Sequence, residues 1–545
     1  MQPSTRRRVA AILLLALGLA AVTWAALQRA EPYLGHDESV YAARARSWAT
    51  GQPSAGWEVY RPVGLPAVGR VVLGLVGTVT GSDPTAQASD GGLQPGTATV
   101  VLRVVALGLA LLTLLITYLV GARVIGPPRA AVAVLVVVGG ITFVRRVPEF
   151  LDDIPAAGLL LLAAYLVLRS RRVGVVARAW SLPAAAAVAV TACLVRYGAT
   201  AGLLSIAVAG LVAWGPRVWL RAWRELLGAV AVLAVGLAPV LRYSLRVTGT
   251  PLGLLQRAAD VAHRQYVGEG LVFYARSLPL SLAGPLGGVV MTAGIVGLVL
   301  AARRLIAARQ LAAISLPADR ERVFLGTAAL FALLVLGLVA HGEGRFAMFS
   351  VLALTLLGTD SLVSGLAGRT PRALPVLKSL AVSAAVVAPL TTLYMAGQLD
   401  RVSDVRTSIA DSLGQAGGAA PATTTTTTAA NGVGNGMADG AATGVTVVGE
   451  AATLPCLVVT QTAPEAGWLT GCDARRAEAV RTLPAGVVVY VVDFPDAGTA
   501  AGLARMKALA PDRAWTVRRV HTSGGYSIAD IAVSYPADSD SDSDF

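Results

Sequence analysis

Residues 9–29 read "VAAILLLALGLAAVTWAALQR", and after four residues the chain continues with "LGHDESVYAARARSWATG" (residues 34–51). The first part is an apolar run close to the roughly 20 residues that a helix needs to cross a bilayer. The second part places His36, Asp37 and Glu38 where the backbone should leave the hydrocarbon. The pair predicts a membrane helix followed directly by a charged segment, and that charged segment needs a role.

The whole chain has the composition of a membrane protein. Of its 545 residues, 55% are hydrophobic and 14% are charged, and the mean hydropathy is +0.65. These values lie outside the soluble globular range. About eleven apolar runs are long enough to be spans. They cover residues 9–29, 99–121, 130–144, 154–168, 180–195, 198–215, 226–242, 278–302, 323–340, 346–366 and 379–397.

Arginines set the predicted orientation, because short cytoplasmic loops retain Lys and Arg. An N-terminus inside the cell makes Arg6, Arg7 and Arg8 cytoplasmic, and it also puts most later interhelical arginines inside. The net charge of +13 is then a topology signal, and we expect no nucleic-acid partner. Residues 9–29 are longer than a typical signal core, so we expect an uncleaved first helix in a multi-pass protein of the plasma membrane.

With this topology the polar loops lie on the outer face. They are residues 30–98, 145–153, 242–276 and 341–346. Carboxylates, histidines and arginines are therefore predicted to converge on one side of the membrane.

The chain changes character near residue 400. We expect a transmembrane domain over 1–400, a flexible Thr/Ala/Gly-rich linker over 401–445, a small soluble α/β domain over 446–535 and an acidic tail over 536–545. "PCLVVTQ", "GVVVYVVDF", "WTVRRVHT" and "YSIADIAVSY" resemble strands, and "AGTAAGLARMKALA" has helical spacing. Cys456 and Cys472 share this outer domain, where a disulfide is expected, two free thiols being the alternative.

The charged segment after the first span has helical spacing. Asp37, Tyr41, Arg44 and Trp48 are separated by four, three and four residues, which puts them on one face of a helix along the membrane surface. In the simpler interpretation, Asp37 caps the helix and Trp48 anchors it at the membrane interface. It leaves Glu38 without a role.

A Pro-punctuated segment follows this helix. In "WEVYRPVGLP" (residues 57–66) it carries Glu58 and Arg61, and together with Tyr41 we interpret these as one wall of a polar site.

Two further loops carry candidate groups. "EFLDDIP" offers Asp152 and Asp153, which would otherwise cap the next helix. "HGEGRF" offers His341, Glu343 and Arg345, and its glycines favour irregular backbone lining a polar cavity. The alternative for Glu343 and Arg345 is an ordinary Glu–Arg ion pair at a helix end. Arg196 is a further basic candidate, and its alternative role is that of an arginine at a span end that snorkels to the interface.

The acidic pair after the first span, the tyrosine and the Arg-Pro turn resemble the GT-C superfamily of polyprenyl-phosphate-sugar-dependent glycosyltransferases. "HDESVYAARAR" is most similar to the Asp-Glu loop of the protein O-mannosyltransferase and aminoarabinose transferase branch. "HGEGRF" is similar to a His-Lys-Glu-x-Arg-Phe motif of mannosyltransferases, with Gly342 in place of the lysine. The resemblance covers roughly residues 9–366. Hydropathy, composition and this resemblance together predict a polytopic α-helical membrane protein, GT-C-like with about eleven transmembrane helices, that carries a C-terminal extracytoplasmic α/β domain outside the region of resemblance.

The resemblance also implies an activity, inverting transfer of a sugar, mannose-like in our expectation, from polyprenyl phosphate to an acceptor hydroxyl. Asp37 is then the expected base, with Glu38 orienting a substrate, and Arg345 and His341 at the phosphate. The acceptor would be a glycan, glycolipid or protein. No cofactor is implied with certainty, although Asp37 and Asp153 offer oxygen ligands for a divalent metal.

Two other classes of protein fit the composition. A transporter or flippase of lipid-linked sugars would place ionisable groups near the bilayer midplane on broken helices, often with internal repeats. The charged residues of this chain cluster instead at span ends. A non-enzymatic anchor for the outer domain would need one helix rather than about eleven.

Overall fold

The computed structural model describes two compact units, which we treat separately. One holds the described residues up to Ser403 and the other those from Asp404 onward. The described residues are 3–32, 34–51, 61–80, 97–171, 178–261, 266–277, 283–310, 317–340, 342–367, 373–417, 456–461, 463, 466, 468, 472–495, 502–521 and 528–534.

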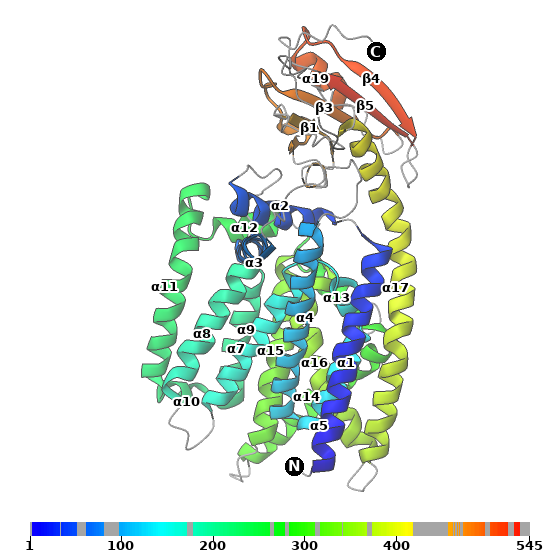
Figure 1. Cartoon of the computed structure of the whole chain (residues 1–545). Coiled ribbons are helices and arrows are strands. Elements are labelled where there is room, and N and C mark those ends of the chain that lie inside the picture. The colour runs from blue at the N-terminus through cyan, green and yellow to red at the C-terminus, as the bar shows by residue number, and fades with distance from the viewer. Residues whose placement is uncertain are drawn as a thin grey trace, which may run out of the picture. The chain divides into compact units, whose positions relative to one another are not determined.

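The first unit is a bundle of helices (Figure 1). Its long members are α1 (Pro3–Ala30), α4 (Thr97–Val124), α7 (Asp153–Ser170), α11 (Trp223–Thr248), α14 (Gly284–Gln310), α15 (Pro317–Val339), α16 (Met348–Ala367) and α17 (Ala373–Gly417). Shorter apolar helices are α3 (Gly64–Thr80), α5 (Pro127–Val138), α8 (Arg178–Val195) and α9 (Ala199–Trp214). Polar or short connecting helices are α2 (His36–Thr50), α6 (Ile141–Arg146), α10 (Pro216–Leu220), α12 (Gly253–Val261) and α13 (Glu269–Ser277).

The polytopic helical fold predicted from the hydropathy pattern is confirmed. Among the described residues, eight helices are long and apolar enough to cross a membrane. Two more of the predicted spans, 180–195 and 198–215, coincide with the shorter helices α8 and α9. The prediction of a single span over 130–144 is wrong, because the helix is interrupted at Gly139 and Gly140, between α5 and α6.

Two other elements differ from expectation. Helix α3 is apolar but was not predicted as a helix, since Pro66 and four glycines obscure its periodicity. Helix α17 continues to Gly417, so the first part of the segment predicted as a linker from 401 is helical. Residues 398–413 contain neither Gly nor Pro, so nothing there ends a helix already begun in the membrane segment. Residues 418–455 and the acidic tail lie outside the described residues.

Small residues let the helices of the bundle approach closely. Helix α14 packs on α16 and α9 packs on α15. A Cβ added at Gly358 would lie 1.7 Å from the carbonyl oxygen of Val290, so α14 and α16 touch backbone to backbone there. Such contacts are typical of membrane helix interfaces, where packing replaces the hydrophobic driving force.

Helix α2 lies across the ends of the neighbouring helices rather than along them (Figure 1). Its N-cap is Gly35, whose N–H donates to Glu38 Oε2 at 3.2 Å. It ends at Gly51, which adopts a left-handed conformation with φ of 77°. The helix predicted from the spacing of Asp37, Tyr41, Arg44 and Trp48 is present, and Arg44 stacks over Trp48 at 5.1 Å from the ring centroid. The cap of this helix is Gly35 and not Asp37.

The second unit contains a five-stranded mixed sheet. Its strands are β1 (Cys456–Val459), β2 (Asp473–Arg475), β3 (Val488–Asp493), β4 (Thr516–His521) and β5 (Ile528–Ser534), in the order β2-β1-β3-β5-β4. Helix α19 (Gly502–Leu509) packs against β3. The four predicted strands and the helix are present, β2 was missed because it has three residues, and the predicted disulfide joins Cys456 to Cys472.

Candidate active site

Asp37 stands in the first turn of α2 and is held by two arginines from distant parts of the chain. Its Oδ1 lies 2.9 Å from Nη2 of Arg61, and its Oδ2 accepts a hydrogen bond from Nη1 of Arg345 at 2.6 Å. The Asp37 side chain keeps 27% of its surface exposed. It is therefore fixed in place and still accessible.

Arg345 belongs to a short 3₁₀ helix, η2 (Gly344–Ala347), that precedes α16. Its Nε donates to Oε2 of Glu343, the residue at the N-cap of η2. The carbonyl of Glu343 in turn accepts a hydrogen bond from the hydroxyl of Tyr274 at 3.3 Å. The glycines on either side of Glu343 give irregular backbone at this point, as predicted.

A second set of groups lies at the start of α7. Asp152 Oδ1 accepts a hydrogen bond from Nη1 of Arg196 at 2.5 Å, and its Oδ2 accepts one from the hydroxyl of Tyr41 at 3.0 Å. Arg196 also forms an ion pair with Asp153. Because Tyr41 is on α2, this set is joined directly to the helix that carries Asp37.

The predicted groups thus meet at one end of the bundle. We call them the arginine–carboxylate cluster: Asp37, Arg61, Asp152, Asp153, Arg196, Glu343 and Arg345.

Phe346 connects the two cations of the cluster. The guanidinium of Arg196 lies 4.7 Å and that of Arg345 lies 5.6 Å from the centre of its ring. Cations placed over an aromatic face are attracted to it. The ring therefore holds two positive groups near each other.

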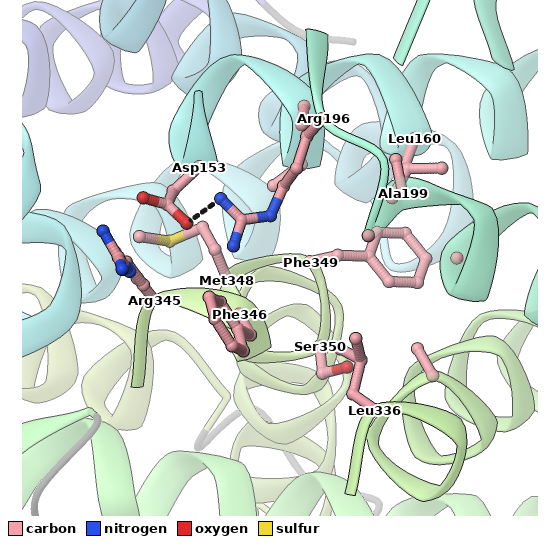
Figure 2. A pocket seen from close by; sticks show the side chains of 15 residues that line it. Asp153, Leu160, Arg196, Ala199, Leu336, Arg345, Phe346, Met348, Phe349 and Ser350 are labelled. Atoms are coloured by element: carbon pink, nitrogen blue, oxygen red, sulfur yellow. Dashed lines mark ion pairs between the residues drawn. The ribbon is translucent and has the colours of Figure 1, made fainter. Parts of the chain in front are cut away.

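A cavity of about 30 Å³ opens beside these cations. Asp153, Arg196 and Arg345 form its polar side, while small and apolar residues of α7, α9, α15 and α16 line the rest (Figure 2). The carboxylate of Asp153 lies between the guanidinium groups of Arg196 and Arg345 in this view. Neither of its oxygens accepts a hydrogen bond from a described residue, although the side chain is buried. The volume suits about two water molecules.

Glu38 points away from Asp37 into the protein. Its two oxygens pair with Nε and Nη2 of Arg103 at 2.9 and 3.1 Å, and Oε1 also accepts the N–H of Phe150 at 2.9 Å. Both charged side chains are 2% exposed. Sequence reasoning missed Arg103, but a signal existed, because it is the one charged residue in the apolar run 99–121.

Two expected site residues, Glu58 and His341, lie outside the described residues. Among the residues that the structure does describe, no group of three His, Cys, Asp or Glu side chains is placed to hold a metal ion. The carboxylate of Asp37 is instead compensated by arginines.

The arginines also control the ionisation of Asp37. Burial raises the pKa of this carboxyl, but the charges and hydrogen bonds of Arg61 and Arg345 outweigh that effect. The resulting pKa lies well below its usual range. Asp37 is therefore a carboxylate at neutral pH, and a weak base as long as both arginines remain in place.

Solved structures with the same fold place the chain in a wider context. ArnT from Cupriavidus metallidurans, bound to undecaprenyl phosphate, superposes with a TM-score of 0.62 at 16% identity, over 95% of this chain and 97% of ArnT. Its apo state gives the same values. The Archaeoglobus fulgidus oligosaccharyltransferase in complex with Zn and sulfate gives a TM-score of 0.50 at 13% identity, over 94% of this chain and 72% of that one.

No protein-family model and no curated protein sequence matches the chain. At these identities the structural likeness shows the fold. The expected polytopic helical fold is therefore shared with ArnT and with the Archaeoglobus fulgidus oligosaccharyltransferase.

Proposed function

We propose that this protein transfers a sugar from a polyprenyl-phosphate donor to an acceptor hydroxyl with inversion at the anomeric carbon. The observation that carries the proposal is the position of Asp37, an accessible carboxylate bonded to an arginine that also lines a cavity. A base beside a cationic site is what such a displacement requires. The shared fold with ArnT, captured with undecaprenyl phosphate, supports the donor class.

Asp37 is the group proposed to act as base. The acceptor oxygen attacks the anomeric carbon and its proton passes to the Asp37 carboxylate. The bond between that carbon and the phosphate oxygen breaks, and its electron pair leaves with the polyprenyl phosphate. The sugar gains one bond and loses one, so no other reactant is needed.

Arg345 and Arg196 are the groups proposed to bind the departing phosphate. Guanidinium groups bind phosphate oxygens through charge-assisted hydrogen bonds, often two at a time. The two arginines share the Phe346 ring and face the same cavity. Their charge would offset the negative charge that develops on the phosphate in the transition state.

Glu38 is proposed to position Asp37 rather than to contact substrate. Its carboxylate is fully engaged by Arg103, Phe150 and Gly35, and it is buried. It therefore ties the start of α2 to α4. Glu343 is proposed to position Arg345 in the same way, because it accepts a hydrogen bond from the Nε of that arginine.

The orientation is part of the proposal. Arginines are concentrated at the helix ends opposite to the cluster, including those between α9 and α11 and those at the end of α14. By the positive-inside rule those ends face the cytoplasm. The cluster would then face the outer side, with the N-terminus cytoplasmic and the C-terminal unit extracytoplasmic. We propose a mannose-like sugar and a glycan, glycolipid or protein acceptor.

The test uses the full chain in lipid vesicles with a panel of radiolabelled polyprenyl-phosphate hexoses and pentoses. Membranes from a strain lacking the protein supply the acceptors. Transfer by the wild-type protein is expected with at least one donor, mannose first. Asp37→Asn retains the shape of the side chain but accepts no proton, so transfer should fall by about 10²- to 10⁴-fold.

Asp360→Asn is the matched control. Asp360 lies near the opposite end of α16 and is also held by two arginines, Arg129 and Arg322. The control should transfer sugar at close to the wild-type rate once its folded fraction is measured. Near wild-type transfer by folded Asp37→Asn would refute the base assignment and make Asp153 the next candidate. Absence of transfer from every donor would contradict the proposed function.

A further inference from the structure

Arg345 contacts both the proposed base, Asp37, and the cavity proposed to hold the donor phosphate. Its Nη1 donates to Oδ2 of Asp37 at 2.6 Å, and the same side chain lines the cavity beside Arg196. Its Nε is occupied by Glu343. Two of the five N–H donors of this guanidinium are thus engaged by carboxylates, and a phosphate can take the donor that faces Asp37 only by displacing that carboxylate.

The space beside the two guanidinium groups is small while Arg345 remains where it is. About 30 Å³ accommodates two water molecules, and Asp153 already occupies the space between the two guanidinium groups. Asp153 already forms an ion pair with Arg196, and its negative charge repels any second anion. A phosphate that binds between the two guanidinium groups therefore competes with Asp153 for Arg196 and with Asp37 for Arg345.

The ion pair with Arg345 also limits Asp37 as a base. A carboxylate with an arginine on each of its oxygens is a poor acceptor for a proton. When Arg345 moves to a phosphate, Arg61 remains on Oδ1 and holds the carboxylate in place. Oδ2 then becomes available to the acceptor hydroxyl.

We infer that the Asp37–Arg345 ion pair is an interlock that withholds the base until the donor phosphate has taken Arg345. This rests on the proposed function and adds a regulation of the same site. The donor would bind first, and an acceptor that arrived at an empty site would meet a carboxylate bonded to arginine. The arrangement also makes Asp37 a competitor of the donor phosphate for one cation.

Binding of decaprenyl phosphate to the full chain in detergent tests this without any turnover. Removing the competitor by Asp37→Asn should tighten binding by about tenfold, the effect of one charge-assisted hydrogen bond. Arg345→Gln should weaken binding. In the double variant, Asp37→Asn should bring no further gain, because the shared arginine is absent. Thermal unfolding establishes that each variant is folded, and Arg345→Lys replaces Arg345→Gln if the latter is not.

The outcomes separate the interlock from the proposed function. If the wild-type protein binds decaprenyl phosphate and depends on Arg345, but Asp37→Asn binds no tighter, the interlock is wrong and the function stands. If Asp37→Asn tightens decaprenyl phosphate binding equally in the presence and absence of Arg345, the effect comes only from long-range charge. That result also overturns the interlock. If the wild-type protein does not bind decaprenyl phosphate, the proposed function fails as well.

Discussion

Arg103 grips both carboxylate oxygens of Glu38, through Nε at 2.9 Å and Nη2 at 3.1 Å, with both side chains almost fully buried. The same guanidinium donates from Nη1 to Gln28 and to the carbonyl of Glu31, both at 2.7 Å. One residue of α4 therefore fixes the end of α1 and the start of α2. The position of Asp37 at the start of α2 therefore depends on the ion pair between Arg103 and Glu38.

Loss of Arg103 should destabilise the protein strongly. Arg103→Ala leaves the Glu38 carboxylate buried without its cation, which typically costs about 3–5 kcal/mol of unfolding free energy. Arg103→Lys retains the charge but not the two-pronged geometry, so we expect an intermediate loss. Thermal unfolding in detergent measures both.

Glu38→Gln distinguishes a positioning role from a catalytic one. Gln retains an acceptor for the N–H of Phe150, so part of the structure should survive. We expect kcat and thermal stability to fall together in this variant. A large loss of kcat without any loss of stability would instead mean that Glu38 contacts substrate.

The ion pairs of Asp37 should make its contribution to stability depend on pH. Its pKa in the folded protein lies well below the usual aspartate value of 3.8, because Arg61 and Arg345 stabilise the carboxylate. The stability that the ionised form supplies is therefore fully present above about pH 4 and is lost as the pH falls further. The gap in melting temperature between wild type and Asp37→Asn should be constant from pH 8 to pH 5 and shrink below pH 4. A gap that widens on acidification would exclude a lowered pKa.

The proposed orientation can be measured with single cysteines. In a Cys193→Ser background, Ala275→Cys on α13 reports the end of the bundle that carries the cluster, and Ser364→Cys reports the opposite end of α16. Both positions are exposed. A membrane-impermeant thiol reagent applied to intact cells should label Ala275→Cys and spare Ser364→Cys. The reverse pattern would place the cluster on the cytoplasmic side.

The disulfide should stabilise the second unit without serving the chemistry. Cys456 and Cys472 are separated by 16 residues, a loop for which chain entropy predicts a stabilisation of about 3 kcal/mol. Cys456→Ser should therefore increase proteolysis of the C-terminal unit while sugar transfer survives in part. Cys193→Ser is the matched control, since Cys193 is a buried free cysteine in α8. Unchanged proteolysis in Cys456→Ser would show that the bridge adds no stability.

Sequence by itself determined the features that depend on local pattern. Hydropathy located most of the apolar helices, because a helix needs a run of about 20 predominantly apolar residues to cross a bilayer. The spacing of Asp37, Tyr41, Arg44 and Trp48 predicted α2, and short segments rich in β-branched and aromatic residues predicted four strands of the second unit. The proximity of Asp37 to Arg345 was also expected, since both follow from which loops share one membrane face.

Partnerships between side chains were decided by tertiary structure. Asp37 and Glu38 are chemically similar neighbours, yet successive residues of a helix point about 100° apart. One reaches Arg61 and Arg345 at the accessible cluster, and the other reaches Arg103 in the buried interior. No local pattern distinguishes them, because the choice depends on where α4 packs against α2, a relation between residues 65 positions apart in the chain.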